Sequence, residues 1–170
     1  MVGIFWNIRG TNQIGKQQCL GGMIRDYSAD FVCFSETKRE VFPSGFWNAL
    51  TPNRDFIWHH NPAMSTAGGI LVGLDKDLFD VIGFVNRKYS IMATVTNKSD
   101  GFKWHLVVVY GPAYTELKME FVSELHDIME HASLPICIGR DFNLVGSQQD
   151  KKGGPINHNL VFIFNDWVNK

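Results

Sequence analysis

Apolar and polar positions follow the same plan near both ends of the chain. In the first stretch, an apolar run at residues 2–6 precedes a weak helical pattern, and a second apolar run follows at residues 31–34. In the last stretch, an apolar run at 104–109 precedes a helical pattern over 116–131, and 134–138 is another short apolar run. Apolar residues three and four positions apart predict the two helices: Leu20, Met23, Ile24 and Tyr27 in the first, and Leu117, Phe121, Leu125 and Ile128 in the second. Each stretch therefore predicts a strand, a helix and a second strand.

The middle of the chain consists of short β-prone runs separated by turn residues. Their close spacing predicts an antiparallel meander over residues 56–59, 69–73, 79–85 and 91–96. Residues 97–101 have the composition of a hairpin turn. Two strand–helix–strand units around a meander predict an α/β protein, a four-layer α/β/β/α sandwich of two mixed sheets with outer helices. No low-complexity linker interrupts the pattern, so we expect residues 1–170 to form a single domain.

Composition narrows the class of protein. Of the 170 residues, 45% are hydrophobic and 19% are charged, which excludes an intrinsically disordered chain. The longest uncharged stretch, residues 56–74, is interrupted by polar residues and is not expected to span a membrane. No targeting signal begins at Met1. Because Cys19, Cys33 and Cys137 cannot all pair with one another, we expect reduced core thiols in an intracellular protein. A net charge of −1 does not predict a broad basic surface.

Polar residues follow the predicted strands at equivalent places. Asn7, Glu36 and Tyr110 each stand at or just past the end of an apolar run, and Asp141 and Asn143 follow the last one. In α/β sheets this edge is where ligand sites collect. Each residue also has a purely structural interpretation, such as an Asx turn or a surface carboxylate. Five such residues at equivalent strand ends favour a site.

The chemistry of this set is coherent. It contains two carboxylates, two amides and a phenol, without a serine–histidine pair or a nearby cysteine. Mg²⁺ prefers hard oxygen ligands, usually one or two carboxylates together with water and substrate phosphate. A second carboxylate can orient and deprotonate water, while amide and phenol groups hold phosphoryl oxygens. The set therefore predicts hydrolysis of phosphate esters.

Five motifs carry a resemblance to a known superfamily. They follow one another along the chain: Trp6-Asn7-Ile8-Arg9-Gly10, Ser35-Glu36-Thr37-Lys38, Ala67-Gly68-Gly69-Ile70-Leu71, Val109-Tyr110-Gly111-Pro112 and Ile138-Gly139-Arg140-Asp141-Phe142-Asn143. With these motifs in this order, the chain resembles the endonuclease/exonuclease/phosphatase superfamily, and among its members most of all the endonuclease domains of plant LINE-type (non-LTR) retrotransposons. Residues 162–168 resemble the helix that follows the last motif. The resemblance therefore implies a DNA-nicking phosphodiesterase.

The resemblance also implies a role for each residue of the site. Glu36 would bind the metal ion, and Asp141 would orient and deprotonate the attacking water. Asn143 would position Asp141 and the scissile phosphate. Asn7 would support the network of metal and phosphate, and Tyr110 would contact a phosphate oxygen. The implied cofactor is Mg²⁺, for which Mn²⁺ can substitute, and no organic cofactor is implied.

Basic residues near the motifs are candidates for substrate binding. Arg9, Lys38, Lys151 and Lys152 would contact phosphates, although the two lysines at 151 and 152 are equally consistent with an exposed loop. The implied partner is DNA, which would place the protein in the nucleus if it acts on genomic DNA. No membrane partner is implied.

Two departures from the family pattern lower the expected activity. Arg140 stands where the family has a glycine, and its side chain is expected to point away from Asp141. The family pattern ends with a Ser-Asp-His motif on a last strand, and residues 1–170 contain no such motif. We therefore expect a domain that is incomplete at its C-terminus and lacks its last strands. Residues 2–6 would then have a free hydrogen-bonding edge, which predicts self-association and weak or no cleavage.

Three functions are compatible with these residues. The first is a Mg²⁺-dependent DNA-nicking endonuclease of retrotransposon origin, degenerate as an isolated chain. The second is a phosphomonoesterase of the same fold that acts on a small phosphorylated molecule. The third is a non-catalytic remnant that at most binds nucleic acid or a partner.

Overall fold

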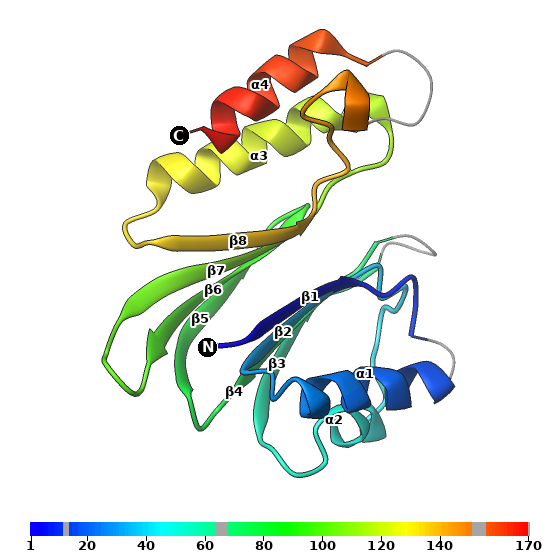
Figure 1. Cartoon of the computed structure of the whole chain (residues 1–170), viewed down its shortest axis with the longest axis vertical. Helices are drawn as coiled ribbons and strands as arrows, with labels where there is room; N and C mark the ends of the chain where they lie inside the picture. Colours follow the sequence, from blue (N-terminus) through cyan, green and yellow to red (C-terminus); the bar gives the residue numbers. More distant parts are fainter. Residues whose placement is uncertain (12–13, 64–67, 151–155, 170) are drawn as a thin grey trace. The chain divides into compact units, whose positions relative to one another are not determined.

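The computed structural model describes residues 1–11, 14–63, 68–150 and 156–169, and of Ile14 and Arg140 only the backbone (Figure 1). The described chain divides into two compact units. Unit 1 comprises Met1–Tyr110 together with Leu134–Asp141, and unit 2 comprises Gly111–Ser133 together with Phe142–Lys170. Both four-stranded sheets lie in unit 1, which gives the chain its mixed α/β class.

The first sheet of unit 1 has the strand order β1-β2-β4-β3. Its strands are β1 (Gly3–Asn7), β2 (Phe31–Ser35), β4 (Ile70–Asp75) and β3 (Phe56–Asn61). β1 and β2 are parallel, as expected for a strand–helix–strand unit, and the other two pairs are antiparallel. Every residue of β2 and β4 is buried, which suits the two central strands of a covered sheet.

The second sheet has the order β5-β6-β7-β8 and is mixed in the same way. Its strands are β5 (Phe79–Asn86), β6 (Ser90–Asn97), β7 (Lys103–Tyr110) and β8 (Ile136–Asp141). β5, β6 and β7 are antiparallel neighbours, whereas β7 and β8 are parallel. The predicted hairpin turn joins β6 to β7, and Gly101 adopts a φ of 70° there.

The predicted antiparallel meander is only partly correct. β5, β6 and β7 follow it, but the chain changes sheets between Asp75 and Phe79 because β4 pairs with β2 rather than with β5. The register pairs Cys33 with Val72 in the centre of the first sheet. Spacing along the sequence could not show this insertion, because each short strand is equally compatible with either neighbour.

The main core lies between the two sheets. Phe31 of β2 is at its centre, with ring centroids 5.9 Å from Trp104 and 6.4 Å from Phe79. Aliphatic residues from β4, β6 and β7 surround these rings and are almost fully buried: Ile70, Val72, Leu74, Ile91, Val95, Leu106 and Val108. Burying each such side chain contributes roughly 1.5–3 kcal/mol. The two sheets therefore form a rigid support for the residues at their ends.

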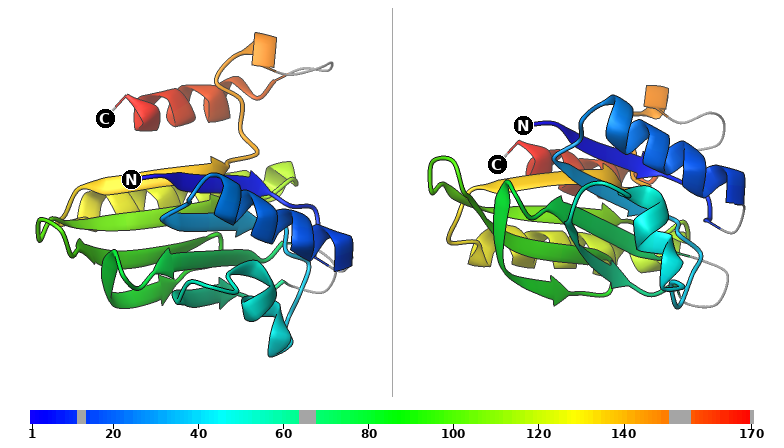
Figure 2. Two further views of the ribbon diagram at one scale, coloured as in Figure 1. Left: turned by 60° about the horizontal axis from the view of Figure 1, so that its bottom comes forward. Right: turned by 90° about the horizontal axis from the view of Figure 1, so that it is seen from below.

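Two helices cover the outer face of the first sheet (Figure 2). α1 (Ile14–Asp26) was predicted, and its Leu20 and Ile24 are buried, but Tyr27 lies beyond the helix and is exposed. α2 (Gly45–Leu50) was not predicted, because six residues are too few to show a periodic pattern. A Cβ at Gly21 would lie 2.6 Å from the carbonyl oxygen of Ala49. Glycine in the middle of α1 thus permits close packing of α2.

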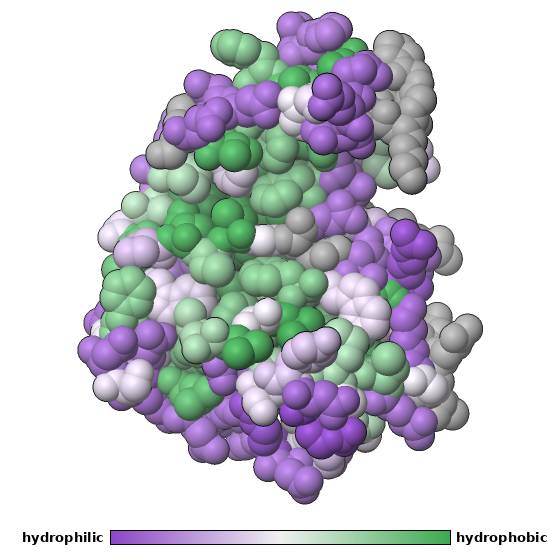
Figure 3. Space-filling view, viewed as in Figure 1, coloured by the Kyte–Doolittle hydropathy of each residue, from purple (hydrophilic) through white to green (hydrophobic). Residues whose placement is uncertain are grey.

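The long edges of the two sheets differ. On the β3 and β5 side, the His59 ring stacks on Phe84 with centroids 4.2 Å apart, and His59 Nε2 lies 2.8 Å from Asn86 Oδ1. On the other side, β1 and β8 are edge strands, and the Phe5 ring packs against Gly139. Apolar residues gather on the surface over β1 and β8 (Figure 3). The sequence had predicted such an apolar edge for β1.

The described residues of unit 2 form two α-helices and two 3₁₀ turns. α3 (Lys118–His131) follows the turn η1 (Thr115–Leu117), and α4 (His158–Val168) follows the turn η2 (Gln148–Asp150). Asn157 caps α4 by accepting a hydrogen bond from the Leu160 amide. Trp167 Nε1 donates to the Leu125 carbonyl oxygen at 3.3 Å, which ties α4 to α3. Both helices were predicted, with slightly different ends.

The cysteines are all free thiols, as expected. Cys33 is buried in β2, and Cys137 in β8 is half-buried, so that burial raises the pKa of the Cys137 thiol. Cys19, in contrast, is exposed on α1, so its assignment to the core was wrong. Cys19 lies on the polar face of α1, and the helical pattern in this stretch was too weak to show which face of the helix is buried. No helix among the described residues is long and apolar enough to cross a membrane.

Candidate functional site

The carboxyl ends of four strands of unit 1 carry four of the predicted site residues. Asn7 ends β1, Tyr110 ends β7, Asp141 ends β8, and Glu36 directly follows β2. Asn7 is the register partner of Ser35, and Tyr110 is the register partner of Asp141. Because β1 is parallel to β2 and β7 to β8, each pair of ends lies side by side in its own sheet. All four side chains belong to half-buried residues.

Two side-chain hydrogen bonds join these ends across the two sheets. The Tyr110 hydroxyl donates to Glu36 Oε1 at 2.7 Å, and Asn7 Nδ2 donates to Asp141 Oδ2 at 3.1 Å. Together with the register of the two parallel strand pairs, these bonds connect the four residues into a closed ring. The structure therefore brings together two carboxylates, one amide and one phenol that stand far apart in the sequence.

The backbone around this ring is strained. Among the described residues, Arg9, Glu36 and Lys38 adopt φ values of 50°, 54° and 54°, in the left-handed region that non-glycine residues rarely occupy. Such conformations cost of order 1–3 kcal/mol each and persist only where surrounding contacts impose them. The Arg9 amide donates to Asn7 Oδ1 at 3.1 Å, which orients the Asn7 side chain.

Hydrogen bonds from two neighbouring loops hold the Glu36 segment in this conformation. The Gly10 amide donates to the Glu36 carbonyl oxygen at 2.6 Å. From the other side, the Thr37 and Lys38 amides donate to the carbonyl oxygens of Gly69 and Gly68 at 3.2 and 3.1 Å. These bonds extend the pairing of the sheet past its strand ends and fix the direction in which Glu36 points.

Thr37 and Thr11 are structural parts of the site that were not predicted from the sequence. Both are fully buried, and a Cβ at Gly69 would lie 2.2 Å from Thr37 Oγ1. Arg39 binds Thr11 through Oγ1 at 2.6 Å and through its carbonyl oxygen at 3.1 Å. Thr37 and Gly69 both belong to motifs found in the sequence, Ser-Glu-Thr-Lys and Gly-Gly, but the motifs do not show that these two residues are in contact.

The predicted phosphate contacts divide into two groups. Arg9 and Lys38 are exposed, and both follow the strand ends that carry Asn7 and Glu36. Lys151 and Lys152 lie outside the described residues, as does the side chain of Arg140. Contacts of Arg9, Lys38 and these two lysines with a substrate stay predictions.

Asn143 lies in unit 2. Its Nδ2 donates to the Gly111 carbonyl oxygen at 2.7 Å, and its own carbonyl oxygen accepts from Lys118 Nζ at 2.7 Å. Asn143 also has a positive φ of 48°. These contacts fix the loop after the last motif within unit 2. A position for Asn143 beside the carboxyl group of Asp141 stays a prediction.

The donor set at the strand ends is suited to a hard cation with few protein ligands. Among the described residues, no three His, Cys, Asp or Glu side chains cluster as a metal cage. Glu36 uses Oε1 to accept from Tyr110, and Asp141 uses Oδ2 to accept from Asn7. One or two carboxylates completed by water and substrate oxygens is the usual coordination of Mg²⁺. The residues present therefore fit this ion.

Solved structures with the same architecture are known. Neither the protein-family models nor the curated proteins include a match to this chain. The catalytic domain of human Nocturnin with a bound sulfate anion has a TM-score of 0.65 and 17% identity, over 85% of this chain. An endonuclease/exonuclease/phosphatase family protein from Bacteroides thetaiotaomicron has a TM-score of 0.61 and 14% identity, over 83% of this chain. This chain has the endonuclease/exonuclease/phosphatase fold.

A third structure with this fold contains nucleic acid. It is D. rerio TDP2 in complex with a single-strand DNA product, with a TM-score of 0.60 and 14% identity over 84% of this chain. This chain spans 64%, 62% and 60% of the three structures, less than two thirds of each. At these identities the likeness confirms the predicted endonuclease/exonuclease/phosphatase fold. The predicted closeness to plant LINE-type retrotransposons stays a prediction.

Proposed function

We propose that the strand-end ring of Asn7, Glu36, Tyr110 and Asp141 hydrolyses phosphodiester bonds with the help of Mg²⁺. The observation that carries the proposal is the pair of hydrogen bonds across the sheets, from Tyr110 to Glu36 and from Asn7 to Asp141. These bonds orient two carboxylates from different sheets before any substrate arrives. Preorganised groups of this kind supply much of the stabilisation of charge in a transition state.

Each residue has a distinct part in the proposed reaction. Asp141 accepts the proton of the water that attacks phosphorus, and Asn7 holds its carboxylate in position for this transfer. Tyr110 has one hydroxyl proton, which it donates to Glu36 in the free protein, and it would donate this proton to a non-bridging phosphate oxygen when substrate binds. Glu36 would hold Mg²⁺, with Mn²⁺ as a substitute, and the ion would supply Lewis-acid stabilisation of charge on the phosphate. The exposed Arg9 and Lys38 would bind the phosphate backbone next to the reacting group.

DNA is the proposed substrate, and nicking of one strand is the proposed outcome. Solved structures of this fold include TDP2 with a single-strand DNA product, and the motif wording favours an endonuclease of retrotransposon origin. Such an enzyme would act in the nucleus. Residues 1–170 contain no Ser-Asp-His motif, so we expect slow cleavage.

The proposal is tested with supercoiled plasmid DNA in Mg²⁺ and in EDTA. The wild-type chain is expected to relax the plasmid slowly and only in Mg²⁺. Glu36→Gln and Asp141→Asn should each lower this rate, and loss of a general base typically costs ~10²–10⁴-fold. Glu40→Gln is the matched control, because Glu40 is an exposed carboxylate on the same loop.

The other outcomes distinguish the alternative functions. Release of inorganic phosphate from small phosphomonoesters without plasmid nicking would replace the proposal by a phosphomonoesterase. Equal rates for wild type, Glu36→Gln and Asp141→Asn in both assays would favour a non-catalytic remnant. Circular dichroism of the variants establishes that each substitution leaves the fold intact.

A further inference from the structure

The loops that follow β1 and β2 pair with each other at the strand-end ring. The loop after β1 includes Thr11, and the loop after β2 begins with Glu36 and continues to Arg39. The Gly10 amide donates to the Glu36 carbonyl oxygen at 2.6 Å, and the Thr11 amide donates to the Thr37 carbonyl oxygen at 3.2 Å. A contact that fixes Thr11 therefore also fixes the backbone that carries Glu36.

The Arg39 guanidinium makes such a contact. Its Nε donates to Thr11 Oγ1 at 2.6 Å, and its Nη2 donates to the Thr11 carbonyl oxygen at 3.1 Å. Thr11 is fully buried, and its hydroxyl group in turn donates to the Thr37 carbonyl oxygen at 3.3 Å. The guanidinium carbon lies 5.9 Å from the centroid of the Phe46 ring, and the Arg39 carbonyl oxygen accepts from the Ala63 amide at 2.9 Å. Arg39 is thus fixed through both its side chain and its backbone.

The geometry at Thr11 requires an arginine rather than any basic residue. A guanidinium is planar and carries its N–H donors in a rigid fork, so it can reach two acceptors of one residue while one face lies against an aromatic ring. A lysine has the same charge, but its donors are all on one nitrogen atom. Arg39→Lys would therefore retain the charge and lose the paired contact with Thr11.

The charge and the hydrogen bonds of Arg39 should affect a metal ion at Glu36 in opposite ways. A positive charge near the site opposes the binding of a cation. The hydrogen bonds support binding, because they help to hold a segment in which Glu36 has a φ of 54°. Such a conformation persists only where surrounding contacts impose it. Removing Arg39 would thus strengthen metal binding through charge alone and weaken it through loss of position.

We propose that Arg39 is a positioning residue of the strand-end ring, which holds Glu36 in the orientation that binds Mg²⁺ by fixing Thr11. The inference rests on the proposed phosphodiesterase function and adds to it a residue that touches neither the ion nor the substrate. Arg39 acts through residues 10–11 and 36–37, whose backbones are paired. Its hydrogen bonds, rather than its charge, determine the affinity for the metal ion.

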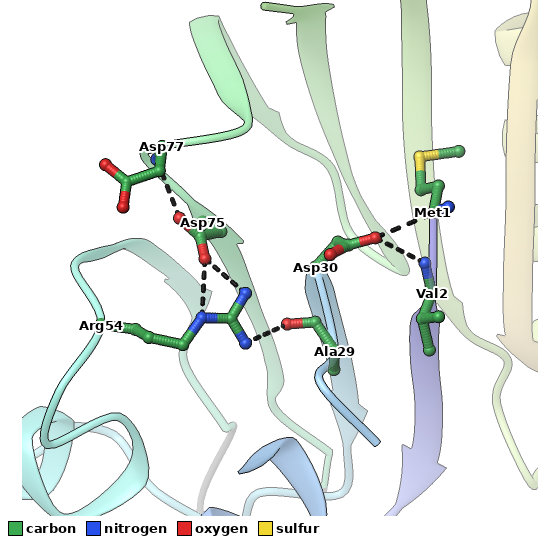
Figure 4. Close-up of polar contacts among 7 residues, drawn as sticks. All are labelled: Met1, Val2, Ala29, Asp30, Arg54, Asp75 and Asp77. Carbon is green, nitrogen blue, oxygen red and sulfur yellow. Dashed lines mark hydrogen bonds and ion pairs between the residues drawn. The ribbon is translucent and has the colours of Figure 1, made fainter. Parts of the chain in front are cut away.

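Arg54 provides a matched control at the opposite end of unit 1 (Figure 4). Its guanidinium donates to the Asp75 carboxylate and to the Ala29 carbonyl oxygen, and it lies 5.1 Å from the Phe56 ring. Arg54 therefore also joins a side-chain acceptor, a backbone acceptor and an aromatic ring. Asp75 is the last residue of β4, and the first residue of β4 pairs with the end of β2 next to Glu36. A change at Arg54 should affect stability but not the site.

The first measurement is amide hydrogen exchange in the metal-free protein. In Arg39→Gln and Arg39→Lys, the Gly10 and Thr11 amides should exchange roughly ten-fold faster than in the wild type, the effect of losing one hydrogen bond to a charged group. Arg54→Lys should leave exchange at these two amides unchanged. This measurement reports on the loop alone and does not depend on catalysis or on metal binding.

The second measurement is the dissociation constant for Mn²⁺, obtained by electron paramagnetic resonance with the same variants. Arg39→Gln should bind Mn²⁺ about ten-fold more weakly, as is usual for the loss of a residue that supports a metal ligand. Arg39→Lys should also bind more weakly although it keeps the charge, and Arg54→Lys should bind like the wild type. Thermal unfolding establishes that each variant is folded at the temperature of the measurement.

The results distinguish this inference from the proposed function. Faster exchange at Gly10 and Thr11 together with weaker Mn²⁺ binding in both Arg39 variants supports the positioning role. Unchanged exchange, wild-type or tighter binding by either Arg39 variant, or equal weakening in Arg54→Lys overturns it. Glu36→Gln tests the proposed function separately. If the wild type binds no Mn²⁺, or binds it no better than Glu36→Gln, the metal-dependent function fails and the inference fails with it.

Discussion

The Tyr110 hydroxyl donates a 2.7 Å hydrogen bond to Glu36 Oε1, and this bond joins the end of β7 in one sheet to the loop after β2 in the other. The second bond joins the same two sheets with donor and acceptor exchanged, because Asn7 of the first sheet donates to Asp141 of the second. The relative position of two candidate catalytic carboxylates is therefore set by residues that are themselves part of the site.

Replacing Tyr110 by phenylalanine tests this relationship. Tyr110→Phe removes one hydrogen bond, which should lower the free energy of unfolding by about 0.5–1.5 kcal/mol. Because Glu36 then loses the donor that orients it, binding of Mn²⁺ measured by electron paramagnetic resonance should weaken. Tyr114→Phe, at a residue that is 69% exposed, should change neither quantity. Unchanged Mn²⁺ affinity in Tyr110→Phe would show that the hydroxyl does not orient Glu36.

The contact of Gly69 with Thr37 makes Gly69 sensitive to the smallest substitution. In Gly69→Ala the new Cβ would lie 2.2 Å from Thr37 Oγ1, and φ at this position is 87°. Gly101→Ala has a similar φ of 70° but open space around the new Cβ. Gly101→Ala should therefore lower the free energy of unfolding only by the ~1–2 kcal/mol that a left-handed alanine costs. Gly69→Ala should lower it by clearly more, because its Cβ also meets Thr37. Urea unfolding of the two variants gives this comparison, and equal losses would contradict it.

Thr37 and Thr11 should respond oppositely to loss of their hydroxyl groups. Thr37 Oγ1 is buried and has no hydrogen-bond partner among the described residues, whereas Thr11 Oγ1 accepts from Arg39 at 2.6 Å. Thr37→Val keeps the shape and removes an unsatisfied polar atom, so stability should stay the same or rise. Thr11→Val should lose about 1–3 kcal/mol, because a charged donor loses its acceptor. Thermal unfolding that shows the same sign for both variants would refute this distinction.

The three cysteines should react with iodoacetamide in a fixed order. Cys19 is exposed, Cys137 is half-buried and Cys33 is buried. Burial raises the pKa of the Cys137 thiol, so a smaller fraction is thiolate at neutral pH, and its alkylation should need higher pH than that of Cys19. Peptide mass spectrometry of the native protein should find Cys19 modified first and Cys33 last. Faster labelling of Cys137 than of Cys19 at neutral pH would contradict this order.

We propose self-association through β1, which among the described residues is an edge strand of the first sheet. The Ile8 amide donates to Ser35, so alternation along a parallel strand directs the amides of Ile4 and Trp6 toward β2 and those of Gly3 and Phe5 outward. In dilute protein, hydrogen exchange should be slow at Ile4 and Trp6 and fast at Phe5. If copies of the chain pair through β1, raising the protein concentration should protect Phe5 and increase the mass seen by light scattering. Growth in mass without protection of Phe5 would place the contact elsewhere.

The sequence by itself determined the elements that depend on local pattern. Both strand–helix–strand units, the hairpin turn at Gly101 and the placement of Asn7, Glu36, Tyr110 and Asp141 at strand ends could be predicted. Hydrophobic periodicity shows them because burial of one face repeats with the geometry of the strand or helix itself. The short α2 and the exposed position of Cys19 could not be predicted in this way, since neither changes the period of the apolar positions.

Only the tertiary structure decided how these elements meet. Insertion of β4 beside β2, the side-chain bonds from Tyr110 to Glu36 and from Asn7 to Asp141, and the bond from the Tyr110 amide to Tyr89 all join residues distant in the chain. The left-handed φ of Glu36 is likewise imposed by hydrogen bonds from two other loops. Such features arise where the energy of many non-local contacts exceeds the conformational preference of the local sequence. The local sequence by itself therefore does not predict them.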